Sequence, residues 1–209
     1  MRRAAETQTF EGRIAGLGTS SGTRIVLGLW RRTPLGPFAD AMIERADGER
    51  ILIAPAREVA ELIAGLYGFD RVLVEPLRAR GEGRTLLVRS HALQLDVEVG
   101  RVSPLGVLLR SVPRPVARSW RFAAAVHPLA RLLVPGAGTA GSAGVGAREY
   151  YGVSDARGIT AASGAFEGED LGALTRLDPP VRFGFAQTPA APTLVDVVTT
   201  VRRTGGMRA

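Results

Sequence analysis

Polar and apolar residues alternate along most of this 209-residue chain, and short turn-forming sequences separate the alternating runs. Residues 92–99 are the clearest case, because Leu93, Leu95 and Val97 are separated by polar residues. Successive side chains of a β-strand point to opposite faces of a sheet, so this pattern predicts a strand with one buried face. A regular succession of strand and helix patterns is missing, which argues against a doubly wound α/β fold.

We expect about ten strands with tight turns between them. They are predicted at residues 9–17, 23–30, 38–45, 50–54, 71–77, 84–89, 92–99, 148–153, 158–166, 181–185 and 193–202. Asp47-Gly48 between two alternating runs is a strong hairpin signal. The chain is therefore predicted to be a single β-rich domain over residues 1–209, an antiparallel barrel or sandwich, with an α+β arrangement as the alternative.

One clear helix is expected at residues 55–67, where Pro55 suits the first turn and Gly68 suits the C-terminal cap. Its apolar positions fall on one face and are Val59, Leu62, Ile63 and Leu66. Short helices are also predicted near residues 105–110 and 126–133. The Gly- and Ala-rich residues 136–146 are expected to form a loop.

The excess of positive over negative charge is confined to one part of the chain. The formal net charge is +7, all 27 basic residues are arginine, and residues 99–148 contain seven arginines but no Asp or Glu. The rest of the chain is therefore neutral. We call residues 99–148 the basic segment. Solvated arginines whose stems cover apolar neighbours are the simpler interpretation, and docking on an anionic membrane or partner is the other. Pro113 and Pro115 exclude one continuous helix here.

The composition excludes several chemistries. Without lysine, the chain can form no lysine Schiff base and no P-loop. Without cysteine, it has no thiol nucleophile, thiolate metal site or disulfide. No Gly-x-Ser-x-Gly elbow occurs, and the two histidines show no metal-ligand spacing, so we expect neither a metal nor a cofactor. No nucleic-acid motif or aromatic stacking run is present, and no nucleic-acid partner is expected.

Two sets of side chains are candidates for a site. Asp96 and Glu98 lie two residues apart on one predicted strand and share a face, which suits acid/base chemistry. His91 is a third candidate, nearby in sequence. The simpler interpretation is that this face of the strand is exposed to solvent. The candidate ligand-binding residues are Arg110, Arg118, Arg121, Tyr150 and Tyr151. Tyr150 and Tyr151 point to opposite faces, so one of them is expected to line an apolar pocket.

No signal peptide follows the basic N-terminus, and no run approaches the ~20 apolar residues of a bilayer span, so a cytoplasmic location is expected.

The stretches REYYGVSDARGITAASGAFEGEDLGAL, at residues 148–174, and DPPVRFGF, at residues 178–185, resemble a group of uncharacterised proteins of GC-rich bacteria. By strand rhythm and length, the layout also distantly resembles the barrel of the acetoacetate decarboxylase-like superfamily. That resemblance implies a β-barrel. Acetoacetate decarboxylases use a catalytic lysine, which is missing here, so the resemblance transfers no functional residue.

Three functional hypotheses follow. The first is a β-barrel that binds a small, partly apolar or anionic ligand in its interior. The second is a lysine-independent acid/base enzyme that acts on a small carboxylate or keto-acid-like substrate. The third is docking of the basic segment on an anionic membrane or partner. The oligomeric state stays open.

Overall fold

A computed structural model describes residues 6–133, 140–143, 147–184 and 189–203 of the chain. Its strands are β1 (Glu6–Thr19), β2 (Arg24–Arg32), β3 (Phe38–Glu44), β4 (Arg50–Ala54), β5 (Arg71–Val74), β6 (Arg78–Glu82), β7 (Thr85–Arg89), β8 (Leu93–Val102), β9 (Ala140–Ala143), β10 (Ala147–Phe166), β11 (Glu169–Asp170), β12 (Leu174–Thr175) and β13 (Thr193–Arg203). Its helices are α1 (Arg57–Ala64), α2 (Pro104–Ser111), α3 (Arg114–Ala117) and α4 (Trp120–Leu133).

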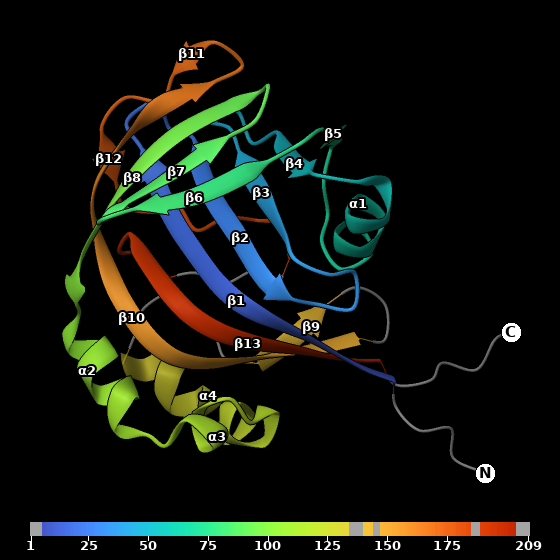
Figure 1. Ribbon diagram of the computed structural model, residues 1–209, viewed down its shortest axis with the longest axis vertical. Helices are drawn as coiled ribbons and strands as arrows, with labels where there is room; N and C mark the ends of the chain where they lie inside the picture. The colour runs from blue at the N-terminus through green and yellow to red at the C-terminus, as the bar shows by residue number, and fades with distance from the viewer. Residues whose placement is uncertain (1–5, 134–139, 144–146, 185–188, 204–209) are drawn as a thin grey trace, which may run out of the picture.

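Ten of the strands form one path in the order β5-β4-β3-β2-β1-β13-β10-β8-β7-β6. Neighbouring strands are antiparallel except β4 and β5, which are parallel and are joined through α1. The sheet curls into a half-barrel, so that β6, β7 and β8 lie across from β1, β2 and β3 (Figure 1). The predicted mainly β, barrel-like fold is confirmed.

The main core fills one part of the concave side. Leu17 of β1, Leu27 of β2, Val88 of β7 and Leu95 of β8 are fully buried there. Each alternates along its strand with residues on the convex side, as a period of two requires. A second cluster packs α1 against the convex side through Val59, Ala60 and Ile63.

The hairpin between β3 and β4 shows how sequence fixes the local turn. The N–H of Arg45 donates to the carbonyl of Glu49 over 2.9 Å, and the N–H of Gly48 donates to the carbonyl of Arg45 over 3.0 Å. Gly48 has a φ of +94°, a conformation that costs glycine little. The predicted Asp47-Gly48 turn is therefore present.

Helices α2, α3 and α4 gather at one end of the molecule, beside β10 and β13 (Figure 1). Helix α2 starts at Pro104 because the Ser103 hydroxyl accepts the N–H of Gly106 over 3.1 Å. It ends before Val112, which is extended ahead of Pro113. The prolines break the helix as expected. None of the helices in the described ranges is long and apolar enough to cross a membrane.

Several boundaries differ from the expectation. Helix α1 is shorter than the predicted 55–67, and the predicted helix at 126–133 is the second half of the 14-residue α4. Strand β10 is continuous through the expected turn at residues 154–157, where a bulge replaces it. Residues 181–184 form no strand, and Phe185 lies outside the described residues. In the expected loop at 136–146, β9 forms over Ala140–Ala143, and residues 136–139 and 144–146 lie outside the described ranges.

Candidate ligand cleft of the half-barrel

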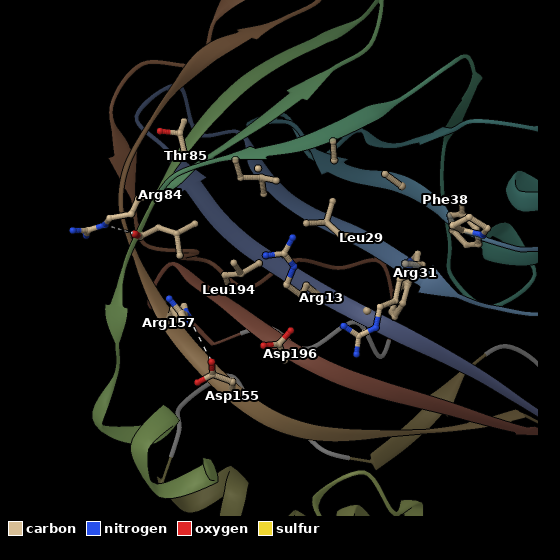
Figure 2. A pocket seen from close by; sticks show the side chains of 18 of the residues that line it. Arg13, Leu29, Arg31, Phe38, Arg84, Thr85, Asp155, Arg157, Leu194 and Asp196 are labelled. Carbon is tan, nitrogen blue, oxygen red and sulfur yellow. Dashed lines mark hydrogen bonds and ion pairs between the residues drawn. The ribbon is translucent and has the colours of Figure 1, made fainter. Parts of the chain in front are cut away.

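A cleft of about 720 Å³ opens on the concave side of the sheet, beyond the main core (Figure 2). Its apolar lining includes Leu29, Phe38, Leu77, Leu86, Val99 and Leu194. Its charged lining consists of Arg13, Arg31, Arg84, Arg157, Asp155 and Asp196. A concave surface with apolar walls and a few charged groups has the usual composition of a small-molecule site.

The strand register brings the charged residues together. Arg13 of β1 lies directly opposite Asp196 of β13, and Asp196 lies opposite Asp155 of β10. These positions continue the concave face that Ala15 and Leu194 occupy in the core. Along these neighbouring strands, the sheet therefore changes from a packed apolar interior to a charged cleft.

Asp155 is held by arginines from two elements. Nε and Nη2 of Arg110 donate to its two carboxylate oxygens over 3.0 and 2.7 Å, and Nε of Arg157 lies 3.5 Å away. Burial would raise the pKa of Asp155, but the hydrogen bonds and charge of Arg110 outweigh it and lower the pKa. Asp155 is therefore a firmly ionised carboxylate whose charge is already compensated.

Glu11 binds three other guanidinium groups next to the cleft. It pairs with Arg31, with Arg32 over 3.0 Å and with Arg118 of the basic segment over 3.1 Å. The hydrogen bond from Arg31 is the largest influence on the Glu11 carboxyl, and it lowers the pKa. The charge of Arg31 is thus engaged before any ligand arrives.

Arg13 is the cleft arginine whose charge is available. No hydrogen bond or ion pair to its guanidinium occurs within the described ranges of the chain. Figure 2 shows its side chain over β1 inside the cleft, whereas Arg84 points outward and donates to the carbonyl of Val99 over 3.1 Å. An unpaired guanidinium beside apolar walls is suited to binding a carboxylate or phosphate.

The candidate ligand-binding residues divide between several places. Arg110 and Arg118 reach acidic residues at the cleft, as described above. Arg121 lies over the Trp120 ring, 5.5 Å from its centroid, and Tyr150 packs against the same ring with centroids 5.4 Å apart. Tyr151 is buried on the other side of β10. None of the five is among the residues that line the described cleft.

Asp96, Glu98 and His91 lie away from the cleft. Asp96 and Glu98 alternate with the core residues Leu95 and Val97, which places them on the outer side of β8. A carboxylate oxygen of Asp96 lies 2.5 Å from Nη2 of Arg89, and the Thr85 hydroxyl donates to Glu98 over 2.5 Å. His91 is exposed in the turn before β8. The acid/base hypothesis gains no geometric support from this arrangement and stays a prediction.

A buried polar cluster formed by Tyr67, Glu149 and Tyr151 was not expected from the sequence. The hydroxyls of Tyr67 and Tyr151 donate to Oε2 of Glu149 over 2.7 and 2.8 Å, and the two hydroxyls lie 3.0 Å apart. Glu149 is 1% exposed, and burial raises its pKa, although both tyrosine hydrogen bonds act in the opposite direction. Glu149 and Tyr151 lie two residues apart on β10, but Tyr67 is more than 80 residues away in the sequence, so no local pattern indicates the cluster.

Asp40 is a second buried carboxyl group. Its Oδ1 accepts the indole N–H of Trp30 over 2.8 Å. Burial raises the pKa of Asp40 to about 7, against the smaller effect of that hydrogen bond. An Asp in the apolar run from Phe38 to Ile43 was the available signal, because such a residue must be buried with a partner or neutralised.

A smaller hollow of about 210 Å³ lies near the turn between β3 and β4. Its central cation, Arg45, pairs with Glu167 over 3.4 Å and with Glu169 over 3.3 Å, so it offers less free charge than the cleft. No group of three or more potential metal ligands occurs within the described ranges.

Comparison with known proteins gives little beyond layout. No protein-family model matches the chain, and no curated protein matches it. Among solved structures, the crystal structure of acetoacetate decarboxylase from Legionella pneumophila matches with a TM-score of 0.45 and 9% sequence identity, over 100% of this chain and 89% of that chain. At this TM-score the match describes a similarity in layout and carries no functional argument.

Proposed function

We propose that the half-barrel cleft binds a small organic anion that carries an apolar portion. The observation that carries the proposal is the unpaired guanidinium of Arg13 inside a cleft of about 720 Å³. The cleft lining contains four arginines and two aspartates, so its formal charge favours an anion.

The apolar lining supports the second half of the proposal. Leu29 and Leu194 flank Arg13 on the neighbouring strands β2 and β13, and Phe38 lies further along the wall (Figure 2). A ligand carboxylate on Arg13 would therefore place a short aliphatic or aromatic group on these side chains. Burial of that group supplies affinity, and the guanidinium supplies orientation.

Isothermal titration calorimetry with matched ligand pairs tests the proposal. Phenylacetate and hexanoate are compared with phenylacetamide and hexanamide, which keep the shape and lose the charge. We expect the acids to bind at least tenfold more tightly than the amides, because a hydrogen bond to a charged group contributes about 1.5–3 kcal/mol.

Two variants locate the binding. Arg13→Gln should weaken acid binding about 10- to 100-fold and leave amide binding unchanged, whereas Arg176→Gln, an exposed arginine outside the cleft lining, should change neither. Ala79→Trp, at an exposed position of the cleft lining on β6, should reduce the binding of both ligands by filling the cleft.

Equal affinity for acid and amide would contradict the proposal, as would acid binding that survives Arg13→Gln. Acid binding that is insensitive to Ala79→Trp would place the ligand elsewhere on the molecule.

A further inference from the structure

Helices α2 and α3 pack on β10 through small buried positions. Gly106 of α2 is buried, and a Cβ at this position would collide with the backbone carbonyl of Ala156. Ala117 of α3 is 1% exposed, and its carbonyl lies over Gly152 of β10. Both helices therefore pack against β10 through a residue with a small side chain or none.

The opposite face of these helices is apolar and exposed. Leu108 follows Gly106 by two residues, about 200° around the helix, and so points away from β10. Val107 and Leu108 are 63% and 59% exposed, the largest exposed fractions of the big apolar residues in the described ranges, and Val116 of α3 is 43% exposed. The solvent-facing side of a helix usually carries polar residues. Because these positions are aliphatic instead, they mark a contact surface.

Exposed positive charge lies close in sequence to these aliphatic residues. Arg101 precedes α2, Arg114 begins α3 and Arg121 lies in the first turn of α4; all three are exposed and form no ion pair with any carboxylate of the described ranges. Arg110 and Arg118 instead bind Asp155 and Glu11 and hold the helices on the sheet. The basic segment contains no acidic residue to offset the three free arginines.

Exposed aliphatic side chains beside unpaired arginines favour one class of partner. A second copy of the chain would bring two surfaces of the same charge together, which electrostatic repulsion opposes. A nucleic acid offers phosphates but no apolar layer for Val107, Leu108 and Val116. An anionic lipid surface offers both, with headgroup phosphates for the arginines and acyl chains directly beneath.

We propose that α2, α3 and the start of α4 dock on anionic lipid surfaces, with Val107, Leu108 and Val116 at the headgroup–acyl boundary and Arg101, Arg114 and Arg121 on lipid phosphates. The helices lie together at one end of the molecule, where a flat membrane can reach them (Figure 1). The proposal is independent of ligand binding in the cleft.

Vesicle flotation of the full chain tests this surface. The vesicles are phosphatidylcholine alone or phosphatidylcholine with 30% phosphatidylserine, at 50 and 300 mM NaCl. We expect at least a tenfold preference for the anionic vesicles at 50 mM salt and a marked loss at 300 mM, because the added salt shortens the Debye length.

Two sets of variants separate the charged and apolar contributions. The triple variant Arg101→Gln, Arg114→Gln and Arg121→Gln should weaken binding about 100-fold, since each basic residue near such a surface contributes about fivefold. The variant Val107→Ser with Leu108→Ser should weaken it at least tenfold and leave the salt dependence in place. The matched control is Arg57→Gln, Arg78→Gln and Arg176→Gln, which removes three exposed arginines outside the basic segment and should retain most of the binding.

Equal binding to neutral and anionic vesicles would overturn the proposal, as would a control variant as weak as the arginine triple. Binding to soluble poly-glutamate as tight as to vesicles would assign the surface to an acidic protein instead. Concentration-dependent self-association in sedimentation velocity that Leu108→Glu abolishes would assign it to a second copy. Circular dichroism of every variant establishes that a loss of binding is not a loss of fold.

Discussion

Arg110 of α2 and Asp155 of β10 form a bidentate ion pair, with N–O distances of 3.0 and 2.7 Å between residues 45 positions apart. The pair joins the helical end of the molecule to the wall of the cleft. Asp155 also accepts the N–H of Ala156 over 2.9 Å, so its carboxylate is held both by α2 and by its own strand just after the bulge.

We predict that Arg110→Met lowers the free energy of unfolding measurably more than the same change at an arginine without an ion pair. The change removes two hydrogen bonds to a carboxylate whose side chain is only 12% exposed, although Arg110 itself is half exposed, which reduces the effect. Urea unfolding followed by tryptophan fluorescence measures it. Arg114→Met, at an exposed arginine without an ion pair in the described ranges, serves as the control and should stay within about 0.5 kcal/mol. Equal effects of the two changes would contradict the prediction.

We predict that Asp40 makes stability fall as the pH rises from about 4 to about 7. The folded protein keeps the Asp40 proton up to a pKa of about 7, whereas the unfolded chain releases it near 3.8. The stabilisation is therefore complete below pH 4 and is lost by pH 7, a difference of about 4 kcal/mol.

Asp40→Asn retains an acceptor for the indole N–H of Trp30 and removes the titration. Unfolding free energies of both proteins, measured at intervals from pH 4.5 to 7.5, should converge in acid and diverge toward neutral pH, where the variant is the more stable protein. Parallel curves for the two proteins would show that Asp40 does not titrate in this range.

We predict that Tyr67→Phe lowers the free energy of unfolding by about 1–2 kcal/mol, because buried Glu149 loses one of its two hydroxyl donors. The double variant with Tyr151→Phe should cost more than the sum of the two single changes, since Glu149 then keeps neither donor. Denaturant unfolding of the three variants gives the coupling energy. Strict additivity would contradict the prediction, because it would mean that each tyrosine donates to Glu149 without energetic coupling to the other.

We predict that Gly12→Ala destabilises the fold by about 2–3 kcal/mol. A Cβ on Gly12 would collide with the backbone carbonyl of Leu29 at the bulge between β1 and β2. Gly158→Ala is the matched control on β10, because nothing lies within 4 Å of a Cβ there. Thermal unfolding should separate the two variants by several degrees. A Gly158→Ala protein as unstable as Gly12→Ala would contradict the collision as the cause, because backbone entropy alone favours alanine at such a position.

The fold could be predicted where the signal is local. Alternation marks β8 because every second side chain is buried, and Asp47-Gly48 marks the β3–β4 turn because glycine alone adopts its backbone conformation at little cost. At residues 154–157 the turn-like sequence was misleading. The hydrogen bonds of β10 to β13 continue past Ser154 through a bulge, and only the partner strand determines this.

The candidate site could not be predicted in the same way. Arg13, Asp155 and Asp196 lie on β1, β10 and β13, whose adjacency is a property of strand order and leaves no trace in any one segment. Arg110 and Arg118 were selected for charge alone, and the structure pairs them with acidic residues at the cleft. Tyr151 was selected as an aromatic residue; its partner Glu149 is two residues away on the same strand, but its other partner, Tyr67, comes from a distant part of the chain.

The sheet does not close into a complete barrel, and β6 is one of its edge strands. All five residues of β6 are exposed, and charged side chains occupy every second position, at Arg78, Arg80 and Glu82. An edge strand presents unpaired backbone N–H and C=O groups to which strands of other molecules can add to form fibrils. Charged side chains at alternate positions oppose this addition. The molecule can thus keep the mouth of its cleft open to solvent without becoming a template for aggregation.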